Sequence, residues 1–236
     1  MTTTGLPGAT TPGTPGYPDR RRLSVHRAGI VPYGEALRLQ ENLVARVRTG
    51  EVPDTLVLLE HPHVITLGSS SDPAHVLLGD AEREARGVEL HRVGRGGSVT
   101  YHGPGQLVAY PIIDLKPDRK DLHAYLRDLE EVLIRVAAAF GADARRREGL
   151  TGVWTDRGKL AAIGVRVSSQ WIASHGAALN VSSDLGFFDA IVPCGLAGEE
   201  VTSLEAEIGS PLDLEDVRRT LAEHFAAVFD REIIVA

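Results

Sequence analysis

The sequence predicts an α+β fold, a mixed β-sheet with helices on one face. Apolar residues recur at helical spacing in three long segments, and short runs rich in β-branched residues, bounded by Gly or Pro, lie between them. The short runs come in consecutive groups instead of alternating strictly with helices, which favours a mixed sheet over a wholly parallel one. No internal repeat or polar linker interrupts the chain after residue 22, so we expect a single domain over 23–236.

The first quarter of the chain is expected to hold a tail, a helix and two strands. Residues 1–22 begin with a Thr-, Gly- and Pro-rich stretch and lack the basic and apolar regions of a secretory signal, so they predict a disordered tail. Residues 33–49 carry apolar side chains at helical spacing, and Gly50 suits the left-handed position after a helix. The runs 55–59 and 64–67 are the first two predicted strands.

The remainder of the chain is expected to hold three further strands and two further helices. A strand is predicted at 106–115, and the helix predicted at 121–140 has one continuous apolar stripe. Two more strands are predicted at 160–167 and 171–181. The last helix begins after Asp213, whose carboxylate can cap its first turn.

Composition narrows the class of protein. Of 236 residues, 43% are hydrophobic and 24% charged, which excludes a disordered or fibrous chain. The formal net charge of −7 argues against a nucleic-acid-binding protein, because such binding relies on many Lys and Arg contacts with phosphates. No stretch approaches the ~18 consecutive apolar residues of a membrane helix, and one cysteine cannot form an intramolecular disulfide. We therefore expect a cytoplasmic protein that binds neither nucleic acid nor membrane.

The densest group of unusual residues lies at 93–106. Five glycines are interrupted there by Arg95, Tyr101 and His102, a combination that core packing does not explain. Glycine permits positive φ angles and lets backbone N–H groups approach a ligand closely. The segment matches neither a P-loop nor the dinucleotide-binding glycine pattern. A ligand-binding loop and a pair of tight turns between strands both remain open.

Other segments combine small residues with a reactive side chain. Lys159 opens an apolar run, and residues 174–180 are small along most of their length. Cys194 lies between Pro and Gly, which places it on a turn. A neighbouring cation lowers the pKa of a thiol, and Lys159 or one of nine histidines could supply it. His61 and His63 have no further ligands at metal-binding spacing, so no metal site is expected.

Together these segments resemble the signatures of the octanoyl-acyl-carrier-protein:protein N-octanoyltransferases, the LipB family of lipoate biosynthesis. The matching segments, in the family's order and at matching separations, are 60–68, 72–75, 95–106, 159–164, 175–180 and 193–195. The resemblance covers 23–236 and implies the α+β fold of the lipoate and biotin protein ligase catalytic domain.

The resemblance also implies an activity. An octanoyl group would pass from octanoyl-acyl carrier protein to a specific lysine of lipoyl domains, in 2-oxoacid dehydrogenase complexes and in the glycine cleavage H protein. Cys194 matches the catalytic nucleophile that carries the acyl group as a thioester, and Lys159 matches the catalytic residue that lowers its pKa. No cofactor and no metal are implied. The substrate-binding residues implied are Arg95, Gly96, Gly97, Ser98, Val99, Thr100, Tyr101, His102, Ala162, Ile163, Gly164, Gly176, Ala177 and Ala178.

Several alternatives stay open from the sequence. Ala177 stands where the family commonly has a larger apolar residue, so the preferred acyl length is not implied. An ATP-dependent lipoate–protein ligase, a transferase that moves octanoyl between lipoyl domains, and a non-catalytic lipoyl-domain or acyl-binding module are competing functions. Basic residues at 145–147, 157 and 166 form either a solvated face or a docking surface for acidic carrier proteins.

Overall fold

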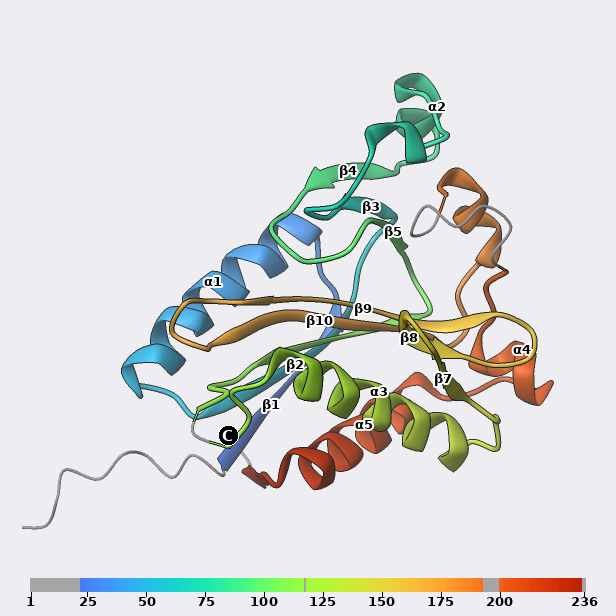
Figure 1. Ribbon diagram of the computed structural model, residues 1–236. Coiled ribbons are helices and arrows are strands. Elements are labelled where there is room, and N and C mark those ends of the chain that lie inside the picture. Colours follow the sequence, from blue (N-terminus) through green and yellow to red (C-terminus); the bar gives the residue numbers. More distant parts are fainter. Residues whose placement is uncertain (1–21, 117, 193–199, 235–236) are drawn as a thin grey trace, which may run out of the picture.

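The computed structural model describes residues 22–116, 118–192 and 200–234 (Figure 1). The predicted tail lies outside these residues except for Arg22, where the first strand begins, and Cys194 lies outside them too. The centre of the molecule is an eight-stranded mixed sheet. Its strands, in spatial order, are β11 (Glu232–Ile234), β1 (Arg22–Ile30), β2 (Asp54–Glu60), β6 (Gln106–Ile112), β10 (Ala173–Asn180), β9 (Lys159–Val167), β8 (Leu150–Trp154) and β7 (Arg145–Arg147).

Helices cover both faces of this sheet, so the expectation of helices on one face is wrong. The helix α1 (Tyr33–Thr49) packs on one face, while α3 (Leu122–Ala139) and α5 (Leu214–Phe229) pack side by side on the other. The reason lies in β2 and β6, which are buried along almost their whole length and therefore need cover on both sides. Within the described ranges, no helix is both long enough and apolar enough to cross a lipid bilayer.

The ends of the long helices follow the predicted local chemistry. Asp121 accepts hydrogen bonds from two backbone N–H groups of the first turn of α3, at 2.8 and 3.1 Å. Asp213 caps α5 in the same way through Glu215 N, at 2.8 Å. Gly50 ends α1 with a φ of 73°, which is the left-handed conformation that glycine adopts without strain.

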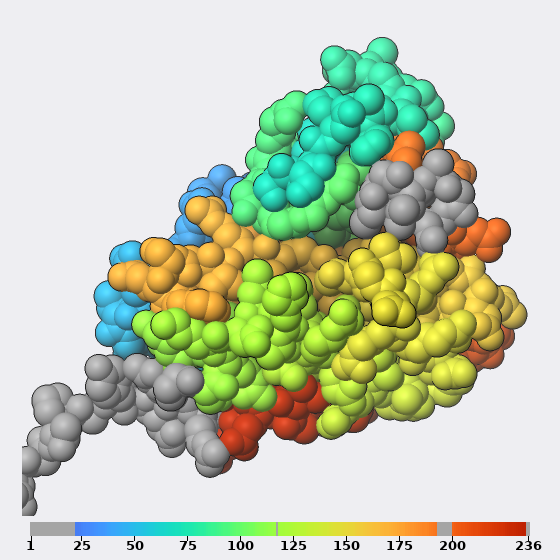
Figure 2. All heavy atoms as spheres, in the orientation of Figure 1, coloured from blue at the N-terminus to red at the C-terminus, as the bar shows by residue number. Residues whose placement is uncertain are grey.

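A second, three-stranded sheet stands above the main one. It contains β4 (Glu89–Arg92), β3 (Val64–Leu67) and β5 (Val99–His102), in that spatial order. The short helices η1 (Pro73–His75), α2 (Asp80–Ala85) and η2 (Leu185–Ala190) accompany it, whereas α4 (Leu204–Ile208) belongs to the main body. Figure 2 shows this part, coloured teal to green, projecting from the body that carries α3 and β8. The strand predicted at 64–67 therefore exists, but in a separate sheet.

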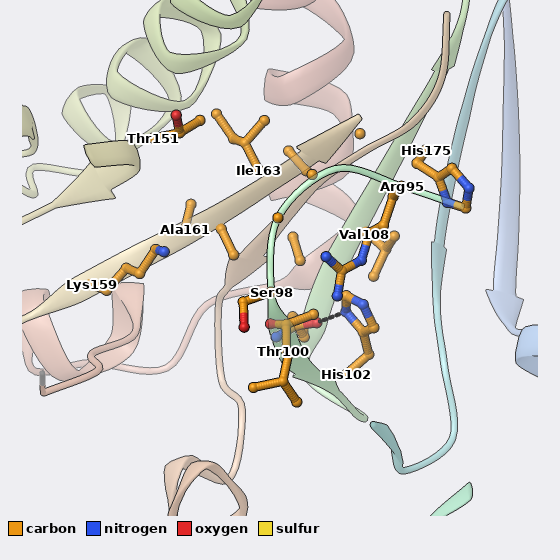
Figure 3. A pocket seen from close by; sticks show the side chains of 18 of the residues that line it. Arg95, Ser98, Thr100, His102, Val108, Thr151, Lys159, Ala161, Ile163 and His175 are labelled. Atoms are coloured by element: carbon orange, nitrogen blue, oxygen red, sulfur yellow. Dashed lines mark hydrogen bonds between the residues drawn. The ribbon is translucent and has the colours of Figure 1, made fainter. Parts of the chain in front are cut away.

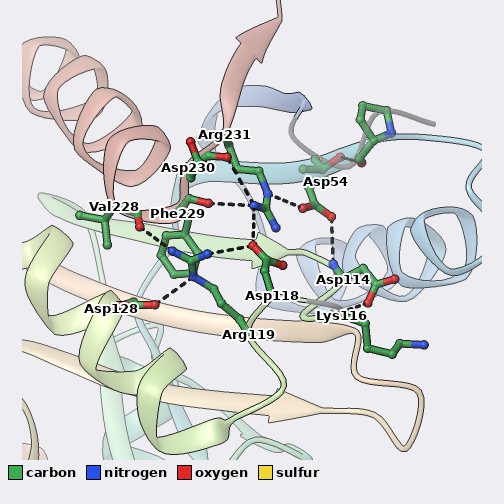
Figure 4. A network of polar contacts seen from close by, with 12 residues as sticks. Asp54, Asp114, Lys116, Asp118, Arg119, Asp128, Val228, Phe229, Asp230 and Arg231 are labelled. Carbon is green, nitrogen blue, oxygen red and sulfur yellow. Dashed lines mark hydrogen bonds and ion pairs between the residues drawn. The ribbon is translucent and has the colours of Figure 1, made fainter. Parts of the chain in front are cut away.

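Buried charges fasten the C-terminal end of the chain to the sheet (Figure 4). Asp54 Oδ2 pairs with Arg231 Nε at 2.9 Å, and Asp54 Oδ1 accepts from Asp114 N at 2.9 Å. Arg231 also reaches Asp118, at 3.1 Å. Burial raises the pKa of Asp54 to about 6, even though Arg231 opposes this shift. The ion pair joins β2 to the segment that follows α5.

Candidate functional site

A cavity of about 400 Å³ lies between the two sheets, a size within the range of small-molecule sites. Figure 3 shows Lys159 on one side of this space and Arg95, His102 and His175 grouped on the other. The floor comes from β9 and β10 and consists of small or apolar residues. These residues are Ala161, Ala162, Ile163, Gly164, Gly176, Ala177 and Ala178. An apolar floor of small residues bordered by polar groups suits an acyl chain.

Two paired glycines keep this floor thin. Gly176 of β10 lies opposite Gly164 of β9 in the ladder. A Cβ atom at Gly176 would lie 2.1 Å from Ala109 O, and one at Gly164 would lie 3.0 Å from the side chain of Arg95. A side chain therefore has no room at Gly176, and one at Gly164 would require Arg95 and the backbone of Gly96 to shift.

Arg95 holds the glycine-rich segment over the cavity. The side chain is 7% exposed, and its Nη2 donates to Thr66 O at 2.9 Å and to Thr66 Oγ1 at 2.8 Å. Its Nη1 donates to Gly96 O at 3.0 Å, while Gly96 N donates to Val165 O at 2.8 Å. The segment is thus tied both to β3 and to β9, which makes it a roof over the cavity.

The turn at Gly105, at the end of the glycine-rich segment, is held in place through a residue of helix α5. Gly105 adopts a φ of 79°, and its N–H donates to Glu60 Oε2 at 2.8 Å. Glu60 Oε1 accepts from Arg218 Nη2 at 2.9 Å, and both charged side chains are largely buried. The buried ion pair therefore sets the position of the turn that leads into β6.

Three buried histidines border the cavity or lie directly behind its lining. His61 is 0%, His102 7% and His175 4% exposed. Burial lowers their pKa to about 4, 3 and 4 respectively, so all three are neutral near pH 7. His61 Nδ1 donates to Val31 O at 2.7 Å, and its Nε2 consequently accepts from Tyr110 OH at 2.7 Å. The donor and acceptor nitrogens of His61 are thus fixed by its two hydrogen bonds.

Lys159 lines the cavity from the first position of β9. Its ammonium lies 5.1 Å from the centre of the Trp154 ring. Its backbone N–H donates to Glu200 O at 2.8 Å, and its carbonyl accepts from Thr202 N at 3.0 Å. The chain that returns after residue 199 therefore runs beside Lys159.

The predicted substrate residues gather around this one cavity. All of them line it except Gly96, which bonds to β9, and Tyr101. The Tyr101 hydroxyl lies 2.7 Å from His63 Nδ1, and its ring stacks on Phe187 at 5.2 Å. Its role here is to pack the small sheet, away from the cavity.

Sequence reasoning missed several lining residues. The unpredicted ones are Tyr33, Ser70, His75, Gln106, Val108, Tyr110, Gly149, Leu150, Thr151, Ala161, His175, Asn180, Phe188 and Val201. Gln106, His175 and Asn180 stand inside or beside the quoted motifs, and that position was their only available signal. His75 and Ala161 also lie inside quoted segments, whereas most of the others come from outside them.

The basic residues at 145–157 have partners within the protein. Arg145 pairs with Asp156, and Arg146 contacts Glu131 at 2.9 Å. Arg157 donates to a backbone carbonyl at 3.0 Å. The two ion pairs reduce the charge that this surface presents to a partner. Among the residues that the structure describes, no group of three or more His, Cys, Asp or Glu side chains could hold a metal ion.

Comparisons with known proteins agree with this geometry. Residues 32–226 match the lipoyl protein ligase A/B catalytic domain. The chain is 50% identical to an octanoyltransferase of Rubrobacter xylanophilus over 89% of its length and 95% of the relative's. It is 46% identical to an octanoyltransferase of Solibacter usitatus, covering 91% of this chain and 96% of that protein.

Solved structures show the same fold at much lower identity. Lipoate-protein ligase A bound with ATP superposes with a TM-score of 0.69 at 17% identity, covering 91% of this chain and 89% of that one. A bi-partite lipoate protein ligase from Thermoplasma acidophilum gives 0.69 at 18% identity, covering 91% and 87%. The α+β architecture expected from the sequence is therefore confirmed. By its sequence similarity to these relatives and its match to this domain, the chain belongs to the octanoyltransferase family, within the lipoyl protein ligase A/B catalytic domain.

Proposed function

We propose that this octanoyltransferase takes an octanoyl group from octanoyl-acyl carrier protein and passes it to a specific lysine of lipoyl domains, with Cys194 as the covalent carrier. The curated relatives are named for octanoyl transfer, which supports the acyl group. The cavity floor of small residues supports a slender apolar substrate. The carrier protein and the lipoyl domain are the donor and acceptor that this activity implies. A cytoplasmic location stays a prediction.

The chemistry divides into two steps. The Cys194 thiolate attacks the thioester of the carrier's phosphopantetheine arm, the acyl–sulfur bond to Cys194 forms, and the pantetheine thiol leaves with a proton from Lys159. The ε-amine of the acceptor lysine then attacks the acyl-enzyme, an amide forms, and the Cys194 sulfur leaves while Lys159 accepts the proton of the amine. Thioester exchange is nearly thermoneutral and amide formation is downhill, so neither step needs ATP.

The placement of Lys159 carries this proposal. Its side chain lines the cavity, and its backbone N–H donates to the carbonyl oxygen of Glu200. Glu200 is the first described residue after 193–199, the segment that contains Cys194. On the other side of that segment, Val192 N donates to His75 O at 2.8 Å, and His75 also lines the cavity. Both described flanks of the Cys194 segment thus lie at the cavity.

Intact-protein mass spectrometry tests the proposal directly. After incubation with octanoyl-acyl carrier protein, we expect a mass gain of one octanoyl group that Cys194→Ser lacks. Lys159→Ala should slow both the gain and the later transfer to a lipoyl domain, and should raise the pH at which the thiol reacts with an alkylating agent. An unmodified wild-type protein, or equal labelling of Cys194→Ser, would reject the covalent route.

The fold neighbours motivate a second candidate. Lipoate-protein ligase A, which was solved with ATP, has the same architecture. A ligase of that kind would use free octanoate and ATP without a cysteine nucleophile. An assay of both donors separates the two functions, and octanoyl-lipoyl domain as a third donor tests transfer between lipoyl domains. A non-catalytic acyl-binding module predicts instead that Cys194→Ser retains full function.

A further inference from the structure

A directional chain of hydrogen bonds starts at a backbone carbonyl and ends at a cavity histidine. Asn180 Nδ2 donates to Thr202 O at 3.0 Å. A carbonyl oxygen can only accept, so the nitrogen of this amide must face Thr202. Its oxygen, Oδ1, then faces Gln106, and it accepts from Gln106 Nε2 at 2.9 Å.

The direction continues to the imidazole. Gln106 Nε2 also donates to Tyr101 O at 3.3 Å, so the amide nitrogen of Gln106 is placed by two acceptors. Its oxygen consequently lies toward His102, where Oε1 is 2.7 Å from Nδ1. An amide oxygen carries no hydrogen, and the proton of this bond must therefore reside on His102 Nδ1.

The surroundings of His102 keep the ring neutral with this single proton. The titratable and charged groups that influence it or contact its ring are His61 after β2, Tyr33 of α1, Arg95 of the glycine-rich segment and His175 of β10. None of these four is a carboxylate, and a second proton would add a charge near Arg95 at a buried position. Nε2 therefore keeps its lone pair as a hydrogen-bond acceptor, on a residue that lines the cavity.

We propose that Gln106 and Asn180 are positioning residues, which fix His102 as a neutral acceptor that aligns an N–H group of the substrate. The inference rests on the proposed function, because that function brings two N–H donors to the cavity, the pantetheine amide of the acyl donor and the ε-amine of the acceptor lysine. His102 acts as neither acid nor base in this role. The proton transfers of the two chemical steps involve Cys194 and Lys159 alone.

The tautomer is tested by long-range ¹H–¹⁵N correlation spectra of ¹⁵N-histidine-labelled protein. We expect the wild-type His102 signals to show a proton on Nδ1 and none on Nε2 throughout the neutral range. Gln106→Glu replaces the amide by a carboxylate beside Nδ1, which favours the imidazolium and puts a second proton on Nε2. Gln40→Glu is the matched control, since Gln40 is 2% exposed and its Oε1 accepts from His175 N, outside this chain of bonds. It should leave the His102 signals in place.

The role in the reaction is tested by separating the two half-reactions. In Gln106→Glu we expect octanoyl transfer to be about tenfold slower at pH values where His102 is charged, because the substrate then loses one hydrogen bond. The transfer rate should recover at higher pH, where His102 loses its second proton. A loss in acyl-enzyme formation from octanoyl-acyl carrier protein identifies the pantetheine amide as the donor. A loss only in transfer from preformed acyl-enzyme to the lipoyl domain identifies the lysine amine. His102→Gln, which keeps an acceptor oxygen, should retain more activity than His102→Leu.

The outcomes that overturn the inference are distinct from those that overturn the proposed function. A wild-type His102 with its proton on Nε2, or one that is charged near pH 7, refutes the tautomer whether or not any variant folds. The positioning role of Gln106 is refuted if the Gln106→Glu protein transfers octanoyl at the wild-type rate at all pH values although its His102 is charged. Absence of a Cys194-dependent acyl-enzyme would reject the proposed function while leaving the spectra unaffected.

Discussion

Acidification should destabilise this protein through its buried histidines. His61, His102 and His175 are neutral in the folded protein, because burial lowers their pKa to about 4, 3 and 4. In an unfolded chain a histidine has a pKa of ~6.5. Between these values the unfolded chain binds protons that the folded protein does not bind, so the free energy of unfolding falls as the pH falls below about 6.5.

The magnitude follows from counting protons near pH 5.5. The three histidines take up about three protons on unfolding. Asp54 acts in the opposite direction, because burial raises its pKa to about 6 and the folded protein holds a proton that the unfolded chain releases. The net uptake is about two protons, which corresponds to a loss of about 2.7 kcal/mol of unfolding free energy per pH unit.

Urea unfolding followed by circular dichroism, repeated at several pH values from about 7 to 5, measures this slope. His61→Gln removes one of the three protons, so the slope should fall to about 1.4 kcal/mol per pH unit. Asp54→Asn removes the opposing group and should raise the slope to about 4 kcal/mol per pH unit. A wild-type slope below about 1 kcal/mol per pH unit, or an unchanged slope in His61→Gln, would refute the reasoning.

Three further substitutions test other contacts. Arg218→Met should lower the free energy of unfolding by about 3–5 kcal/mol, because it leaves the carboxylate of Glu60 buried without its cation. Adding Glu60→Gln to this variant should restore part of the lost stability. If the effects of the two substitutions simply add, this reasoning is contradicted. Gly176→Ala should cost at least about 1–3 kcal/mol, since the new Cβ would meet Ala109 O at 2.1 Å, and a wild-type melting temperature would show that the strands yield instead. His175 has a φ of 54°, so His175→Gly should be about 1 kcal/mol more stable than His175→Ala in the same urea assay, and the reverse order would rule out backbone strain there.

Local patterns predicted the long helices well. The apolar stripe of α3 and the caps at Asp121 and Asp213 act within one turn of the chain, so they are legible without knowledge of the fold. Six strands were missed, namely β1, β4, β5, β7, β8 and β11. Five of them are short, and β5 and β8 contain or adjoin glycine, which hides the alternation of side chains. The nine-residue β1 was missed because most of its side chains are polar or exposed. Such strands exist because neighbouring strands provide their hydrogen bonds.

The placement of helices on both faces of the sheet could have been predicted from the short apolar runs of the sequence. The run in β2, Leu-Val-Leu-Leu, has no polar alternation, which is typical of a strand buried on both faces. Helices on both sides of the sheet follow from that pattern. The assignment of the 64–67 strand to a separate sheet does not follow, because only long-range pairing with β4 and β5 decides it.

The site shows the same division between local and distant information. The glycine-rich segment and the small residues 174–180 were singled out from the residues themselves, and 162–164 from the resemblance to the octanoyltransferases; they do surround one cavity. The bond between Gln106 and Asn180 joins residues 74 positions apart and depends on the register of β6 with β10. No sequence pattern of one chain reports that register. The predicted pairing of Cys194 with Lys159 stays a prediction, because Cys194 lies outside the described residues.

The parallel pairing of β1 with β11 has a practical consequence for experiments with large partners. Arg22 pairs with Glu232 and Ser24 with Ile234, so both ends of the described chain emerge together at one border of the eight-stranded sheet (Figure 1). The cavity lies over β9 and β10, beyond β2 and β6. A tag or reporter fused directly at Arg22 or at Ile234 would therefore begin at the border of the sheet that lies away from the cavity-lining strands β9 and β10.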